Sequence, residues 1–367
     1  MKIVVTGSNG FIGRNLCVYL KEQQHDVLEI HRETKQQDIL FYLSQADFVF
    51  HFAGINRPKN PAEFKSGNVD LTSFITERLS ENKRSIPIVL TSSTQAEDDN
   101  DYGASKHAAE RIVESYSVAT GSASYIYRLP NVFGKWCKPN YNSFVATFCN
   151  NAVNGKDISV HDPRAAVSLV YIDDVCESFL KLLDGKAPSG FHKVLTEFNT
   201  TVGEVADIIL SFKSSRTSLV MEPVGTKLTR ALYSTYLSCI PPDKFNYSIP
   251  CYTDERGIFC EMLKTKDSGQ FSFFTAHPGI TRGGHYHHTK NEKFLVIKGE
   301  AVFKFQNIST GIRHELKVSG SIPEIVETVP GWTHDITNSG DEELIVMLWA
   351  NEIFDRQKPD TIAKKLF

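Results

Sequence analysis

The 367-residue sequence has few cysteines and no long apolar run. The seven cysteines are scattered, odd in number and form no CxxC pair, which is typical of reduced thiols in a cytoplasm. No stretch approaches the roughly 20 apolar residues of a membrane helix, and the N-terminus lacks the apolar core of a secretion signal. The charge is nearly balanced, with 40 Lys+Arg against 43 Asp+Glu, so there is no long-range attraction to nucleic acid. We expect a cytoplasmic protein that binds neither membrane nor nucleic acid.

The length and a change of pattern predict two domains, residues 1–242 and 243–367, divided after Pro241-Pro242. In the first, apolar runs alternate with segments of helical period, which indicates an α/β Rossmann-like, doubly wound parallel sheet. The expected strands are 2–6, 25–30, 47–53, 86–93 and 123–129. In the second, two-residue alternation between glycine turns indicates an antiparallel barrel or sandwich, with strands within 269–277, 292–305 and 343–350.

A glycine-rich segment, Gly7-x-x-Gly10-x-x-Gly13, follows the first strand directly and opens a helix. This arrangement lets the backbone approach a pyrophosphate that the helix N-terminus binds, so it predicts a dinucleotide site. The second strand ends with Glu29 inside it and Arg32 near its tip. A guanidinium there suits a 2′-phosphate and favours NADPH over NADH, with a solvated arginine as the alternative.

The segment Tyr102-Gly-Ala-Ser-Lys106 places a phenol and an ammonium on one face of a helix. The ammonium lowers the pKa of the phenol, which can then exchange a proton with a carbonyl or an alcohol. Ser93 ends a buried strand nine residues upstream, where its hydroxyl can hold the same oxygen. Ser92 is the alternative, because the acidic insertion 97–101 separates the serine pair from the tyrosine.

Six of the twelve histidines follow residue 276. Strand alternation places His285 and His287 on one face and His288 on the other. Together with Glu292 and His334, the first two form a ligand set suited to a divalent metal, with zinc favoured. A His-x-His pair alone is more often a core or surface pair.

Several motifs of the first domain together resemble the extended short-chain dehydrogenase/reductase family, in its sugar-nucleotide branch, over about residues 1–240. They are TGSNGFIG (6–13), HFAG (51–54), Ser92-Ser93, Tyr102–Lys106, RLPNVFG (128–134) and YIDDV (171–175). The resemblance implies a catalytic set of Ser93, Tyr102 and Lys106, with Tyr102 as acid/base. It implies cofactor contacts from Gly7, Asn9, Gly10, Phe11, Ile12, Gly13, Arg32, Asp38, Ile39, Phe52, Ala53, Gly54, Tyr102 and Lys106. Substrate contacts are implied for Asn131, Asn142, Ser143 and Arg164, where Arg164 is either a phosphate ligand or a surface ion pair.

Two motifs of the second domain resemble those of cupins: HxHx4E with Gly299 after it, and PGxxHxxxN from Pro330 to Asn338. They also resemble deoxysugar 3,5-epimerases, which are cupins. This implies a barrel in which His285 removes a proton beside a ketone, Arg282 holds a diphosphate and His285, His287, Glu292 and His334 bind the metal. No tyrosine follows Tyr286, so the returning proton would come from His287, metal-bound water or Lys293. Cupins often pair through their edges, so a homodimer is expected.

The two halves together resemble bifunctional enzymes of capsular polysaccharide synthesis. The resemblance implies that a UDP-4-keto-6-deoxy-N-acetylhexosamine is epimerised at C3 and then reduced at C4 with NADPH. The implied product is UDP-2-acetamido-2,6-dideoxy-L-talose, on the route to UDP-N-acetyl-L-fucosamine. Three alternatives stay open: a reductase whose cupin only dimerises, a dehydratase/epimerase that returns its hydride, and a non-catalytic sensor of NADP state.

Overall fold

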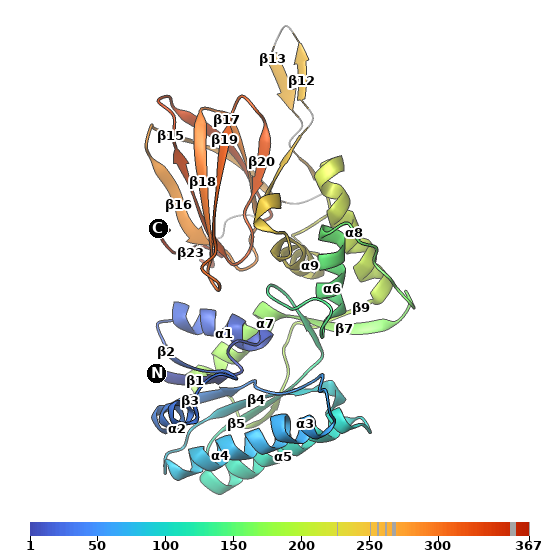
Figure 1. Cartoon of the computed structure of the whole chain (residues 1–367), viewed down its shortest axis with the longest axis vertical. Coiled ribbons are helices and arrows are strands. Elements are labelled where there is room, and N and C mark those ends of the chain that lie inside the picture. Colours follow the sequence, from blue (N-terminus) through green and yellow to red (C-terminus); the bar gives the residue numbers. More distant parts are fainter. Residues whose placement is uncertain are drawn as a thin grey trace. The chain divides into compact units, whose positions relative to one another are not determined.

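The computed structural model describes residues 1–225, 227–249, 251–254, 257–260, 263–265, 269–352 and 357–366 (Figure 1). Contacts divide the chain into two compact units, Met1–Phe133 with Val167–Asn199, and Gly134–Ala166 with Thr200–Phe367. The division by contacts therefore groups residues 134–166 and 200–242 with the β strands that follow. The domain boundary after residue 242, inferred from the change of pattern, stays a prediction.

The first unit contains a six-stranded parallel sheet in the order β2-β1-β3-β4-β5-β8. Its strands are β1 Lys2–Thr6, β2 Asp26–Ile30, β3 Phe48–His51, β4 Ile88–Ser93, β5 Ser124–Leu129 and β8 Gly190–His192. The first five match the apolar runs expected from the sequence. The strand order reverses between β1 and β3, and ligands of open parallel sheets bind beyond the carboxyl ends of strands at such a point.

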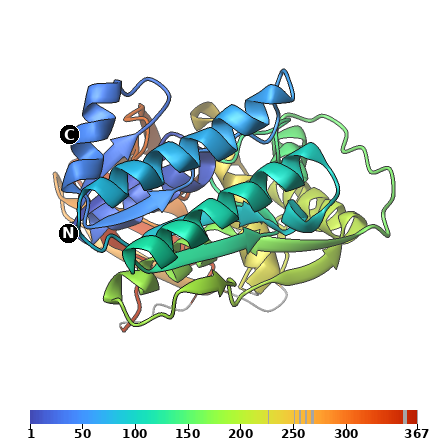
Figure 2. The same ribbon diagram turned by 90° about the horizontal axis from the view of Figure 1, so that it is seen from below.

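Helices cover both faces of this sheet, and α4 and α5 lie side by side across one of them (Figure 2). Leu79 of α4 and Val113 of α5 pack in one core cluster with Val4, Val49 and Ile88 of the strands. The bounds are α1 Phe11–Glu22, α2 Gln36–Gln45, α3 Ala62–Phe64, the π-helix η1 Lys65–Asp70, α4 Leu71–Glu81, η2 Thr94–Glu97, α5 Asp101–Thr120, α7 Ile172–Leu180 and η3 Lys181–Asp184.

In the described residues, the second unit combines three α-helices with two five-stranded antiparallel sheets. Helix α6 (Phe144–Val153) packs against both α8 (Val202–Ser218) and α9 (Lys227–Ser238). One sheet has the order β11-β20-β17-β22-β15 and the other β19-β18-β21-β16-β23. Their bounds are β11 Asn246–Ser248, β15 Gln270–Ala276, β16 Thr281–Tyr286, β17 Glu292–Lys298, β18 Glu300–Asn307, β19 Arg313–Ser319, β20 Glu324–Glu327, β21 Trp332–Asn338, β22 Leu344–Ala350 and β23 Ile362–Ala363.

The expectation of an antiparallel β domain is confirmed, whereas no closed barrel is found among the described strands. Strand pairing over the described residues leaves two separate five-stranded sheets. Their facing sides share an aromatic core, in which the rings of Phe294 and Phe303 lie 5.5 Å apart. The remaining short elements are β6 Asn131–Phe133, β7 Ala166–Tyr171, β9 Phe198–Thr201, β10 Val220–Met221, η4 Pro242–Lys244, β12 Cys251–Asp254, β13 Gly257–Cys260 and β14 Lys264–Thr265.

Two composition-based expectations can be compared with the described part of the chain. No helix in it has the length and apolar character needed to cross a bilayer. Five cysteines there carry free thiols: Cys17, Cys137, Cys149, Cys176 and Cys239.

Candidate functional site

The glycine-rich segment forms a tight turn between β1 and α1. Gly7 has φ +67°, and a Cβ on it would lie 2.8 Å from the backbone nitrogen of Ala53. A Cβ on Gly13 would lie 2.3 Å from the carbonyl oxygen of Gly7. Because these approaches exclude any side chain, both positions require glycine. The turn and the segment after β3 therefore lie together at the switch point of the sheet, with Asn9 and Gly10 exposed.

A buried histidine that the sequence analysis did not single out holds these two segments together. His51 Nδ1 lies 2.7 Å from the hydroxyl of Thr6, which also accepts hydrogen bonds from the backbone N–H groups of Phe52 and Ala53. The Nε2 atom of His51 lies 3.0 Å from the hydroxyl of Thr72. Burial lowers the pKa of His51 to about 3, so the ring is neutral at physiological pH.

The end of β2 lies beside the glycine turn, because Ser8 N–H donates to the Ile30 carbonyl at 3.2 Å. Glu29 forms an ion pair with Lys21 at 2.6 Å, which gives its carboxylate a partner on α1. Arg32 is exposed in the turn after β2. Asp38 and Ile39 are half-buried in the first turn of α2.

The sequence-predicted serine, tyrosine and lysine meet at the carboxyl end of β4. Ser93 is the last residue of β4, and a hydrogen bond between its side chain and Tyr102 partly offsets the rise in the pKa of Tyr102 that burial causes. Lys106 Nζ donates to the Thr91 carbonyl at 2.8 Å. Burial lowers the pKa of Lys106 to about 8, although nearby Glu110 opposes this change.

The neighbouring Ser92 hydroxyl is buried and makes no hydrogen bond within the described structure. It lies beside Glu110, whose pKa is raised by burial but brought below its usual value by hydrogen bonds from Arg128. Arg128 donates to both Glu110 oxygens, at 2.9 and 2.8 Å, and also binds Glu97 of the acidic insertion. The geometry thus favours Ser93, which faces Tyr102, over Ser92, which faces a buried ion pair.

Asn68 is a second buried residue that sequence reasoning missed. Its side chain accepts from Ile55 N–H at 2.7 Å and donates to the Ser105 hydroxyl at 2.9 Å. A Cβ on Gly54 would lie 2.9 Å from Asn68 Oδ1 and 3.6 Å from Lys106 Nζ. Asn68 lies in the π-helix η1, and such single-turn distortions are frequent at functional sites. No sequence pattern marks this distortion.

The expected substrate residues lie on exposed or half-exposed segments. Asn131 begins β6 and is exposed, as are Asn142 and Arg164. The Ser143 hydroxyl accepts from Ala146 N–H at 3.3 Å and so caps α6, which is a structural role for this residue.

The four predicted metal ligands converge in the second unit. One potential ligand atom from each of His285, His287, Glu292 and His334 lies within 4.8 Å of the others. They come from β16, the loop after it, β17 and β21. All except His285, which is half-buried, are buried. His288 instead packs against Tyr286, with ring centroids 5.6 Å apart.

A β-bulge aligns Arg282 with this cluster. Arg282 pairs with Ile336 and His285 with His334, with a register shift between Gly283 and His285. Ile336 and His334 lie two residues apart on β21, so Arg282 and His285 share a face although three positions separate them. Without the bulge, strand alternation would place them on opposite faces. The guanidinium lies 5.1 Å from the Phe274 ring and donates to the Thr275 carbonyl at 2.8 Å.

Lys293, one of the expected proton donors, does not face the cluster. It lies next to Glu292 on β17, where alternation turns it to the opposite face. Its ammonium binds the Glu327 carboxylate and the hydroxyl of Tyr247. The expectation for Lys293 was therefore wrong. Lys290 lies there instead, with its Nζ 2.7 Å from Glu292 Oε1.

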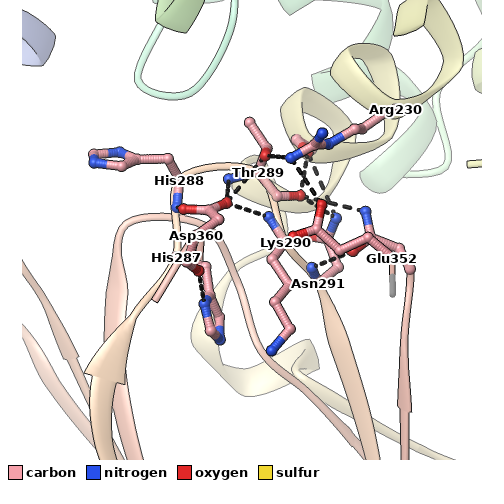
Figure 3. Close-up of polar contacts among 10 residues, drawn as sticks. Arg230, His287, His288, Thr289, Lys290, Asn291, Glu352 and Asp360 are labelled. Atoms are coloured by element: carbon pink, nitrogen blue, oxygen red, sulfur yellow. Dashed lines mark hydrogen bonds and ion pairs between the residues drawn. The ribbon is translucent and has the colours of Figure 1, made fainter. Parts of the chain in front are cut away.

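The chemistry of the cluster fits a divalent cation. The Asp360 carbonyl oxygen is within hydrogen-bond distance of His287 Nδ1, and because a carbonyl only accepts, that nitrogen carries the proton (Figure 3). The lone pair of His287 Nε2 in the neutral ring then points toward Glu292 Oε2 at 3.2 Å. His334 Nε2 lies 3.4 Å from the same oxygen. Without a cation, these ring nitrogens and the carboxylate oxygen are acceptors that repel one another. A divalent cation bound among them would make each a ligand, in a set of the kind that zinc prefers.

The electrostatics agree with this arrangement. Burial lowers the pKa of His285 to about 3, with His334 and His287 adding to the effect. Burial raises the pKa of Glu292, but the neighbouring His287 and His334 rings hold it well below its usual value. The ionised Glu292 carboxylate thus lies among imidazoles, and that of His285 is neutral at physiological pH.

The sequence pattern of the NAD dependent epimerase/dehydratase family matches residues 3–192, and that of a polysaccharide biosynthesis C-terminal domain matches residues 252–362. The first match spans more than half of the chain, which therefore belongs to the NAD dependent epimerase/dehydratase family. The family supports the expected nicotinamide cofactor.

Likeness to individual proteins extends over the whole chain. A UDP-2-acetamido-2,6-beta-L-arabino-hexul-4-ose reductase of Pseudomonas aeruginosa is 54% identical, covering 99% of this chain and 98% of its own. The crystal structure of the capsular polysaccharide assembling protein CapF from Staphylococcus aureus is similar over 100% of both chains, with 41% identity and a TM-score of 0.69. The UDP-glucose 4-epimerase of Thermotoga maritima shares the fold of the first part of the chain. It is 21% identical, the match covers 58% of this chain and 83% of its own, and the TM-score is 0.53.

Proposed function

We propose that this chain is a bifunctional enzyme of capsular polysaccharide synthesis. It epimerises C3 of a UDP-2-acetamido-2,6-dideoxy-4-hexulose and then reduces the C4 ketone with NADPH. The product is UDP-2-acetamido-2,6-dideoxy-L-talose, on the route to UDP-N-acetyl-L-fucosamine. The observation that carries the proposal is the presence in one chain of the Ser93–Tyr102–Lys106 set and the His/Glu cluster. The full-length likeness to a named UDP-4-keto-sugar reductase and to CapF supports it.

The reducing site uses the carboxyl end of β4. NADPH, when bound across the glycine turn, supplies the hydride that reaches C4. Tyr102 gives its phenolic proton to O4, while the Ser93 hydroxyl holds that oxygen. The Lys106 ammonium favours transfer of this proton by stabilising the phenolate that remains. Two features support NADPH over NADH. Arg32 is exposed and can bind a 2′-phosphate, and the Glu29 carboxylate is already paired with Lys21.

The epimerising site, in the β domain that we assign as a cupin, works on the ketone before it is reduced. The 4-ketone acidifies the C3 proton, and half-buried His285 is the ligand-set member accessible enough to remove it. Arg282, on the same face, binds the diphosphate. A divalent metal, for which zinc is favoured, is held by His287, Glu292 and His334. His285 is a fourth ligand if it is not the base. The metal supplies positive charge beside the substrate oxygens. With Lys293 excluded and both ring nitrogens of His287 engaged, by the Asp360 carbonyl and by the cluster, water at the cluster is left as the source of the returning proton.

Deuterium exchange tests both halves at once. The full chain is incubated in D2O with the UDP-4-keto sugar and NADPH, while nicotinamide absorbance and deuterium at C3 are followed together. We expect both signals, with loss of the C3 signal after chelation. Tyr102→Phe should abolish NADPH oxidation but keep C3 exchange, whereas His285→Ala should abolish C3 exchange and, because reduction follows epimerisation, NADPH oxidation with it. If no NADPH is oxidised by the wild type, the substrate class is wrong.

The second candidate is a reductase whose β domain only dimerises the chain. The name of the Pseudomonas aeruginosa relative, which mentions reduction alone, favours it. It predicts NADPH oxidation without deuterium at C3 and an unchanged turnover in His285→Ala. Loss of C3 exchange in that variant would exclude it. In both candidates a homodimer is proposed, and sedimentation of the purified chain tests it.

A further inference from the structure

A C-terminal strap, residues 357–366, runs along the strand that carries the first histidine of the cluster. Its strand β23 pairs with β16, matching Ala363 with His285 and Ile362 with Tyr286. Lys364 N–H also donates to the Gly284 carbonyl at 2.8 Å. The bulged part of β16 is therefore backed by a segment that lies some 80 residues further along the chain.

One residue of this strap, Asp360, contacts four consecutive residues of the loop that follows β16. Its Oδ1 accepts from His288 N–H at 2.8 Å, and its Oδ2 accepts from the N–H groups of Thr289 and Lys290 at 2.6 and 2.7 Å (Figure 3). The hydroxyl of Thr289 adds a fourth bond to the carboxylate at 3.0 Å. The backbone carbonyl of Asp360 takes the proton on His287 Nδ1.

The loop held in this way places a group beside each oxygen of Glu292. His287 Nε2 lies 3.2 Å from Oε2, and Lys290 Nζ lies 2.7 Å from Oε1. Figure 3 shows His287 and Lys290 extending from the loop away from the Asp360 carboxylate, while His288 points to another side. Displacement of the loop would thus shift two contacts of one buried carboxylate together.

We propose that Asp360 is the positioning residue of the His/Glu cluster. Its carbonyl sets the tautomer of His287, so that Nε2 is the atom offered to a metal, and its carboxylate fixes the loop that places His287 and Lys290 beside Glu292. Partners behind metal-binding histidines generally act in this manner. The part of this proposal that concerns metal rests on the proposed function, whereas the part that concerns the His287 ring does not.

The test uses the full chain as wild type, Asp360→Asn, Asp360→Glu and the control Ser319→Ala. The control removes side-chain hydrogen bonds to Glu300 and Ser321, at the ends of β18 and β19. Zinc affinity is measured by competition with a chromophoric chelator. Ring-15N histidine spectra of the metal-free proteins report the His287 tautomer, assigned with His287→Asn, and circular dichroism reports folding.

We expect Asp360→Asn to weaken zinc binding about 10- to 100-fold and to change the His287 ring signals. Asp360→Glu, which keeps the charge, should recover part of both, and Ser319→Ala should match the wild type. If Asp360→Asn does not fold, the comparison of Asp360→Glu with the wild type decides: unchanged affinity and ring signals overturn the proposal. A folded Asp360→Asn with wild-type values also overturns it. If the wild type binds no zinc, the metal site fails, and the ring signals alone decide the role of Asp360.

Discussion

The adjacent serines at the end of β4 provide the sharpest test of the reducing site. The Ser93 side chain lies near enough to Tyr102 to lower its pKa, whereas the buried Ser92 hydroxyl makes no hydrogen bond within the described structure. The two variants Ser93→Ala and Ser92→Ala thus remove the same atom one position apart. Only the first removes a group that contacts the reacting phenol.

The magnitude follows from the kind of bond that is lost. A hydrogen bond to a group that carries charge contributes about 1.5–3 kcal/mol, and about 1.4 kcal/mol corresponds to a factor of ten in rate. We expect Ser93→Ala to lower kcat about 10- to 100-fold. The Ser93 hydroxyl also accepts from Gln95 N–H at 3.2 Å, so loss of this cap should cost about 1 kcal/mol of stability.

The assay is NADPH oxidation at saturating UDP-4-keto sugar, with the midpoint of thermal unfolding measured in parallel. Ser92→Ala should keep kcat within about twofold and change stability by less than about 1 kcal/mol, because the hydroxyl that it removes makes no hydrogen bond to the described part of the chain. If Ser92→Ala loses as much kcat as Ser93→Ala, or if Ser93→Ala keeps wild-type kcat, the assignment of Ser93 is refuted.

Three further predictions concern stability and pH. Gly331→Ala should cost about 2–5 kcal/mol in urea unfolding, because its φ is +78° and a Cβ would lie 2.6 Å from the Trp136 ring; Gly311→Ala, with φ +73° and open space, should cost only about 1–2 kcal/mol, and equal costs would contradict the packing argument. The pKa of Lys106 is about 8, so kcat should fall as pH rises through 8 and the ammonium is lost; a flat profile to pH 10 would contradict this. The pKa of His51 is lowered from 6.5 to about 3, so only the unfolded chain takes up this proton between those values. Stability should therefore fall as pH falls below 6.5, by up to about 1.4 kcal/mol per pH unit, and His51→Gln should remove that part of the slope in urea unfolding.

Some features that the sequence analysis missed could have been found by stricter use of alternation. Lys293 directly follows Glu292 in the same strand, so a period of two turns it away from the cluster. Lys290 precedes Glu292 by two positions and lies beside its carboxylate. The Arg282–His285 pair is different, because only the bulge at Gly283 puts residues three apart on one face.

The sequence by itself determined the alternation of strands and helices, the glycine turn, the Tyr102–Lys106 pair and the histidine motif. These are local patterns, since each depends on the periodicity or spacing within about ten residues, and local backbone geometry preserves them. The match of the first five strands to their apolar runs reflects this.

Tertiary structure alone decided which side chains complete those patterns. Asn68 meets Ser105 across 37 positions, and Asp360 meets Lys290 across 70. Whether the two antiparallel sheets close into a barrel likewise depends on pairing between distant strands. Such contacts are selected by the packing of whole elements, which fixes distances that no spacing along the chain encodes.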